Sequence, residues 1–125
     1  MSEPVRTVLI VDDDPQMLRL VRAMLGPQHV RVLSSPLPSD ALRLCGEEAV
    51  DLMISDVAMP EMDGNKLAER VFRLQPGIKV LLISGEVNEA PPVRGGRVRF
   101  LKKPFFPAEL VRLLREMLAD KAECA

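Results

Sequence analysis

Cysteine and histidine are scarce in this sequence of 125 residues, which contains two cysteines and one histidine. Cys45 falls in an apolar stretch, Cys124 is the penultimate residue, and no CxxC pair is present. This pattern argues against a disulfide and against a metal site built from cysteine and histidine. It favours two reduced thiols, as in a cytoplasmic protein.

Long apolar runs and an excess of charge of either sign are also absent. No segment approaches the roughly 18–20 consecutive apolar residues of a membrane-spanning helix. The N-terminus, Met1-Ser2-Glu3-Pro4, lacks the basic and apolar regions of a secretory signal. The 17 basic and 18 acidic residues give a net charge of −1, which provides no general attraction to nucleic acid or anionic lipid. We therefore expect a cytoplasmic protein without direct nucleic-acid binding or membrane insertion.

The pattern of apolar residues predicts strands that alternate with helices. Short apolar runs rich in β-branched residues are typical of strands that are buried on both faces. The predicted strands are 8–11, 30–33, 52–55, 80–83 and 98–101, and the predicted helices are 15–25, 37–45, 65–74 and a last one from about Pro107. This alternation predicts a single α/β domain with a doubly wound parallel sheet. We expect the domain to span residues 7–119, between tails at 1–6 and 120–125.

Aspartate, proline and glycine mark the predicted helix boundaries. Asp14 is a suitable N-cap for the first helix, and Pro15 is tolerated as its first residue. Gly26 and Pro27 are expected to end that helix, and Gly46 is expected to close the second.

Polar residues cluster directly after the predicted strands. Asp12 and Asp13 follow the first strand, and Asp56 follows the third. Ser84 follows the fourth strand and Lys103 the fifth. Each alone has an ordinary explanation, such as a helix terminus, a turn or a solvated charge. The carboxyl ends of parallel strands meet at one edge, where open α/β folds bind ligands, so their coincidence favours a functional site.

These residue types suit phosphoryl transfer to a carboxylate. Clustered carboxylates repel one another unless a hard cation neutralises them, and magnesium accepts oxygen ligands while leaving room for phosphate oxygens. Asp56 would be the nucleophile, with magnesium on Asp12, Asp13 and Asp56. Lys103 and the Ser84 hydroxyl would contact the transferred oxygens.

Four motifs resemble those of the response-regulator receiver family of two-component signalling. They are Val11-Asp12-Asp13-Asp14, Ser55-Asp56 followed by Met59-Pro60-Glu61-Met62-Asp63-Gly64, Ile83-Ser84-Gly85, and Lys102-Lys103-Pro104-Phe105. The resemblance covers essentially the whole chain and implies a flavodoxin-like strand order of 2-1-3-4-5. It also implies a phosphoacceptor that takes its phosphoryl group from a sensor histidine kinase or a histidine phosphotransfer protein. Such a domain assists its own phosphorylation and dephosphorylation but is a switch rather than an enzyme.

The same resemblance implies roles for individual residues. Asp56 is the expected phosphorylation site, and the backbone carbonyl of Ala58 is the expected third protein ligand of the magnesium ion. Ser84 is the expected switch hydroxyl, and Phe100 takes the place of the switch aromatic. The family's characteristic lysine is Lys103, whose peptide bond to the following proline is expected to be cis.

The stretch between Ser84 and Lys103 departs from the family pattern. It contains Pro91-Pro92 and Gly95-Gly96. An internal proline costs a helix ~3 kcal/mol and a glycine ~1 kcal/mol, so a regular helix is disfavoured here. We expect a degenerate or short fourth helix, a mobile segment from Ala90 to Arg97, and an altered output surface.

Two other classes of function stay open. The first is a magnesium-dependent phosphatase with an aspartate nucleophile, but such enzymes usually carry a second aspartate two residues later, where this chain has Ala58. The second is an interaction module that works without phosphorylation. The acidic pair together with Asp56, Ser84 and Lys103 argues against that class.

Overall fold

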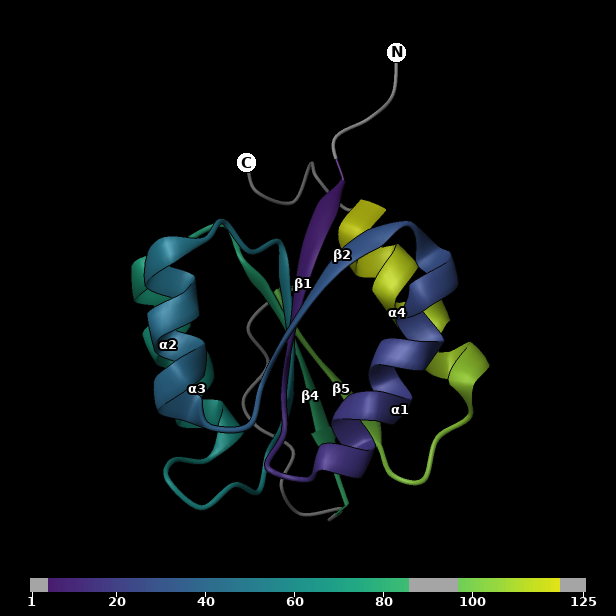
Figure 1. Ribbon diagram of the computed structural model, residues 1–125, viewed down its shortest axis with the longest axis horizontal. Helices are drawn as coiled ribbons and strands as arrows, with labels where there is room; N and C mark the ends of the chain where they lie inside the picture. Colours follow the sequence, from purple (N-terminus) through teal and green to yellow (C-terminus); the bar gives the residue numbers. More distant parts are fainter. Residues whose placement is uncertain (1–4, 86–96, 120–125) are drawn as a thin grey trace.

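The computed structural model describes residues 5–85 and 97–119, which form a five-stranded parallel sheet covered by helices (Figure 1). The strand order is β2-β1-β3-β4-β5, which confirms the doubly wound α/β class and the expected order. The strands are β1 (Arg6–Val11), β2 (Val30–Ser35), β3 (Leu52–Asp56), β4 (Lys79–Ser84) and β5 (Val98–Lys102). The helices are α1 (Pro15–Leu25), α2 (Pro38–Glu47), α3 (Gly64–Leu74) and α4 (Pro107–Ala119), with a 3-10 turn at Gly26–Gln28.

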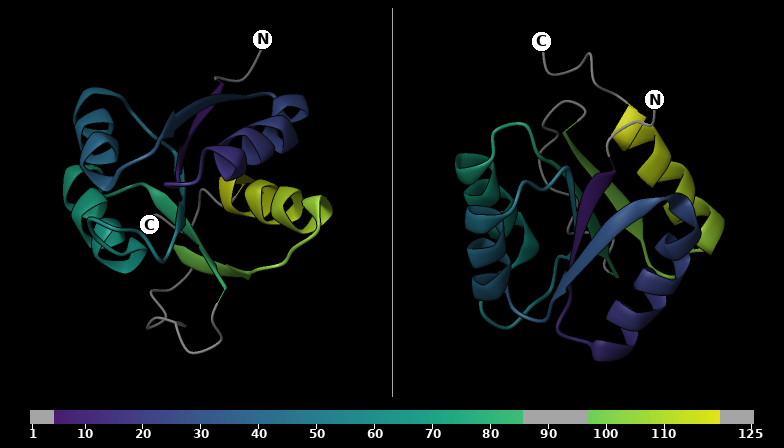
Figure 2. Two further views of the ribbon diagram at one scale, coloured as in Figure 1. Left: turned by 60° about the horizontal axis from the view of Figure 1, so that its bottom comes forward. Right: turned by 45° about the horizontal axis from the view of Figure 1, so that its top comes forward.

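Helices cover both faces of the sheet. Helices α1 and α4 lie on one face, and α2 and α3 lie on the other (Figure 2). Side chains of β1 alternate between the two layers: Val8 and Ile10 pack toward α1 and α4, whereas Leu9 and Val11 pack toward α2 and α3. Full burial of each such side chain contributes roughly 1.5–3 kcal/mol, which explains the continuous apolar runs in the sequence.

The helix boundaries follow the local sequence with one exception. The Asp14 side chain accepts a hydrogen bond from the Gln16 backbone N–H at 2.9 Å, so the predicted cap of α1 is confirmed. The predicted end of α2 at Gly46 is wrong, because the helix continues to Glu47. The Glu47 carboxylate pairs with Arg43 at 3.1 Å, one helical turn earlier, which favours the two additional helical residues.

Several sequence-based expectations fall outside the described residues. The expected degenerate helix, and all of the expected mobile segment except Arg97, fall on residues 86–96, between β4 and β5. The expected tails include residues 1–4 and 120–125. Within the described ranges 5–85 and 97–119, no helix has the length and apolarity needed to cross a membrane. Cys45 is a buried free thiol, and burial raises its pKa to about 11.

Candidate functional site

Asp12 and Asp56 occupy corresponding positions at the carboxyl ends of β1 and β3. The two strands pair in register through Val11 and Ser55, and each aspartate is the next residue along the chain. Asp13 follows directly, and one ligand oxygen from each of the three carboxylates lies within 4.8 Å of the others. The structure therefore brings together the three carboxylates that the sequence placed at the ends of separate strands.

Lys103 lies beside this carboxylate cluster. Its Nζ atom is 3.3 Å from Oδ2 of Asp56, and the exposed fractions of the two side chains are 31% and 12%, respectively. The backbone N–H of Lys103 donates to the carbonyl of Ser84 at 2.8 Å, which joins the ends of β4 and β5. The Ser84 side chain is buried at the same edge. Lys103 thus follows β5 as the sequence indicated, whereas Ser84 is the last residue of β4, one position earlier in its strand than expected.

The shifted pKa of Asp12 indicates what kind of ligand suits the carboxyl edge of the sheet. Burial raises the pKa of Asp12 above its ordinary value, and the negative charges of Asp56 and Asp13 raise it further. A hydrogen bond from the Asp14 backbone N–H to Asp12, and the charge of Lys103, act in the opposite direction. Closely spaced carboxylate oxygens whose negative charges repel one another suit a hard cation such as magnesium.

Gly64 allows the loop after β3 to close against the site. A Cβ atom at this position would lie 2.5 Å from the backbone oxygen of Asp56 and 3.0 Å from Cδ2 of Leu82. The Gly64 N–H donates to the carbonyl of Val57 at 2.8 Å. Gly64 belongs to one of the motifs in the sequence, but the sequence alone does not indicate this role, because the close approach depends on how α3 packs over the end of β3.

The remaining predicted residues lie near the same edge. Phe100 is a half-buried residue of β5 that packs against the core beneath α2 and α3. Ala58 is exposed in the loop that follows Asp56. The Lys103–Pro104 peptide bond is cis, as expected.

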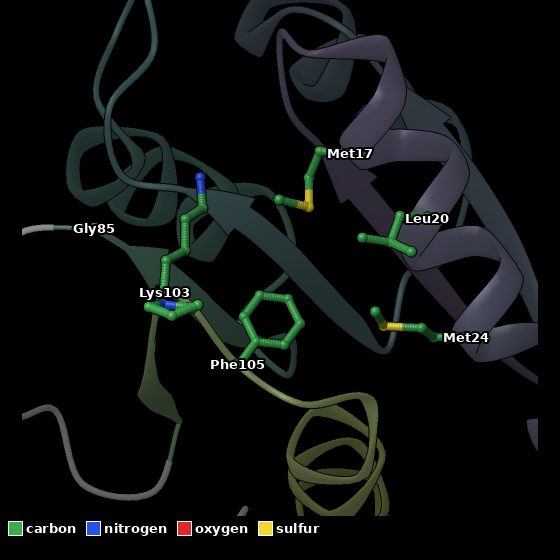
Figure 3. Close-up of a pocket in the computed structure, with 7 residues that line it drawn as sticks. Met17, Leu20, Met24, Gly85, Lys103 and Phe105 are labelled. Atoms are coloured by element: carbon green, nitrogen blue, oxygen red, sulfur yellow. The ribbon is translucent and has the colours of Figure 1, made fainter.

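An apolar pocket of about 460 Å³ adjoins the carboxylate cluster. Figure 3 shows Met17, Leu20 and Met24 extending from α1 toward Phe105. Lys103 lies on the same side of the pocket as Phe105. Leu20 is half exposed, so this helix presents an apolar side chain to solvent here. The pocket and the carboxylate cluster share the Lys103 side chain.

Comparisons with known proteins agree with this arrangement. The family model of the response regulator receiver domain matches residues 8–115. The chain is 39% identical over 114 residues to an uncharacterised 14.6 kDa protein of Leptolyngbya boryana, and the match covers 87% of each protein. It is 33% identical over 125 residues to the transcriptional regulatory protein GlrR of Escherichia coli, covering 98% of this chain but 28% of that protein. The signal receiver domain of an HD domain-containing protein from Pseudomonas fluorescens has a TM-score of 0.87 and 27% identity, covering 96% of this chain and 99% of that one.

This chain therefore belongs to the response regulator receiver domain family. Domains of this family are switches of two-component signalling rather than enzymes in the ordinary sense, and they interact with histidine kinases and phosphotransfer proteins. They typically use magnesium, for which Asp12, Asp13 and Asp56 provide suitable oxygen ligands here.

Proposed function

We propose that this domain is a cytoplasmic phosphoacceptor switch that receives a phosphoryl group on Asp56. The donor is the phosphohistidine of a sensor kinase or of a phosphotransfer protein. The observation that carries the proposal is the contact of 3.3 Å between Lys103 and Asp56, at an edge where the Asp12 and Asp13 carboxylates also converge. The pocket beside Lys103 offers the partner an apolar surface next to the acceptor.

In the proposed reaction, a carboxylate oxygen of Asp56 attacks phosphorus while the bond from phosphorus to the donor nitrogen breaks. Magnesium held by Asp12, Asp13, Asp56 and the Ala58 carbonyl would offset the charge on the transferred oxygens. Lys103 would move from the Asp56 carboxylate to one of those oxygens, over a short distance because it already lies beside the acceptor.

In the proposed switch, a movement of Ser84 is transmitted to Phe100. The Ser84 hydroxyl would donate to a phosphoryl oxygen at the carboxyl edge of the sheet. Ser84 pairs with Lys102 across β4 and β5, so its movement acts close to the half-buried Phe100 on the same strand pair. A change in the position of Phe100 would alter the surface that binds a downstream partner. We propose residues 7–119 as the unit that carries this switch.

Intact-mass measurement with acetyl phosphate tests this proposal. With magnesium present, we expect the chain to gain the mass of one phosphoryl group, which is stable in acid and labile in base. Omitting magnesium or introducing Asp56→Asn should abolish the gain, whereas Glu47→Gln, on the exposed surface of α2, should not affect it. Labelling of Asp56→Asn to the same extent as the unaltered chain would show that the site is wrongly assigned.

A further inference from the structure

Helix α2 begins without a capping side chain of its own. Its N-cap residue is Leu37, which makes no side-chain capping hydrogen bond, although the first N–H groups of a helix need acceptors. Glu61, from another part of the chain, supplies an acceptor for one of these N–H groups. Its Oε1 accepts from the Ser39 N–H at 3.0 Å, and its Oε2 accepts from the Ser39 hydroxyl at 3.3 Å. The positive end of the helix dipole also favours a carboxylate in this position.

Glu61 belongs to the loop of residues 57–63, which connects β3 to α3 and includes Ala58. The loop is fixed at both ends. The Val57 N–H donates to the carbonyl of Ile83 at 2.9 Å, and the Asp63 carboxylate accepts from the Lys66 N–H at 2.8 Å. Between these ends, the hydrogen bonds of Glu61 join the middle of the loop to α2.

The turn that leads into α2 also contacts the acidic pair. The backbone N–H of Asp12 donates to the carbonyl of Ser35 at 3.2 Å, and the Ser35 hydroxyl donates to the carbonyl of Leu37 at 2.8 Å. The start of α2 is therefore linked on one side, through Ser35, to Asp12, the first residue of the acidic pair. On its other side it is bonded, through Glu61, to the loop that follows Asp56.

We propose that Glu61 is a positioning residue for the metal site. By holding the loop against α2, it fixes the Ala58 carbonyl relative to Asp12, so that the two halves of the site keep the spacing that an ion requires. This inference rests on the proposed function. Both Glu61 and Ser39 are exposed, so the contact is expected to affect the geometry of the loop more than the stability of the fold.

Magnesium titration of the whole chain, followed by calorimetry or by backbone amide shifts, separates the hydrogen bonds of Glu61 from its charge. We expect Glu61→Ala to raise the Kd for magnesium by roughly tenfold, the lower end of the range for residues that orient metal ligands. Glu61→Gln keeps an acceptor for the Ser39 N–H but loses the charge, so its Kd should rise less. Ser39→Ala removes one hydrogen bond with no change of charge and should also raise the Kd.

Glu47→Ala is the matched control, because it removes an exposed carboxylate at the other end of α2 and should leave the Kd unchanged. Circular dichroism and urea unfolding should show all four variants folded. Equal effects of Glu61→Gln and Glu61→Ala would assign the loss to charge and overturn the proposal, as would an unchanged Kd in Glu61→Ala. Failure of the proposed function is distinct, since it would appear as magnesium binding by the unaltered chain without labelling of Asp56.

Discussion

The polar side chains at the two ends of the sheet differ in how they are paired. At the amino ends of the strands, Gln75 accepts from the Val50 N–H at 2.8 Å and donates to the carbonyls of Cys45 and Glu48 at 2.7 Å and 2.6 Å. Lys79 is buried there and donates to the carbonyl of Met117 at 2.9 Å. At the carboxyl ends, three carboxylates lie within 4.8 Å of one another beside one lysine contact.

This difference indicates that the polar side chains at the amino ends of the strands stabilise the fold, whereas those at the carboxyl ends serve binding. Hydrogen-bonded polar side chains hold neighbouring segments together, whereas like charges held close together oppose folding. The carboxyl edge retains the unfavourable arrangement, which a cation would relieve. Changes at the amino edge should therefore lower stability without affecting phosphorylation, and changes at the carboxyl edge should affect binding first.

Gly64→Ala should cause the largest loss of stability, and it is an exception to the comparison between the two edges. Gly64 is at the carboxyl edge, but a methyl group there would lie 2.5 Å from the backbone oxygen of Asp56. We expect a loss of roughly 3 kcal/mol in the free energy of unfolding, as for severe overpacking, together with impaired labelling of Asp56. Urea unfolding and intact-mass measurement would show both effects.

Gly77→Ala is the control for that variant. Among the residues that the structure describes, and apart from its two chain neighbours, none has an atom within 4 Å of the position that a methyl group at Gly77 would take. This substitution should therefore leave both stability and labelling nearly unchanged. If Gly64→Ala were as stable as Gly77→Ala, the close packing of α3 over Asp56 would be disproved.

Gln75→Ala should have the next largest effect and acts at the amino edge. It removes the three hydrogen bonds that join the residue after α3 to the end of α2 and to the segment before β3. We expect a loss of about 2 kcal/mol in unfolding free energy, since buried backbone groups lose their partners. The rate of labelling of folded protein should not change.

Gln75→Glu sharpens this test, because a glutamate can accept from the Val50 N–H but cannot donate to the two carbonyls. It should therefore be destabilised as well. A weaker affinity for magnesium in either variant would show that the two edges are coupled, contrary to the comparison.

Local patterns account for what the sequence predicted. Apolar periodicity located the strands, the Asp14-Pro15 pair located the start of α1, and the order of strand ends placed Asp56 and Lys103 at one edge. The sequence could not predict contacts between side chains and distant backbone. Glu61 and Ser39 are 22 residues apart, and Gln75 bonds to a carbonyl 30 residues away. Such contacts depend on how helices pack, which periodicity does not specify.

Asp12→Asn should have the smallest effect on stability, but of the opposite sign. Burial and the charges of Asp56 and Asp13 raise the pKa of Asp12, so its ionised form opposes folding at neutral pH. An asparagine can still accept from the Asp14 N–H, so the local turn is retained. Without magnesium, we expect a small rise in the unfolding free energy, smaller in magnitude than the losses in Gly64→Ala and Gln75→Ala.

Asp51→Asn is the matched change at the amino edge. The Asp51 carboxylate accepts from the Thr7 N–H at 2.8 Å, and loss of its charge should weaken this bond and lower stability. Urea unfolding at low ionic strength, with and without magnesium, measures both variants. Magnesium should stabilise the unaltered chain and Asp51→Asn but not Asp12→Asn, because only the last variant loses a proposed ligand of the ion. If Asp12→Asn were less stable than the unaltered chain without magnesium, the two edges would not differ in the way that their charges indicate.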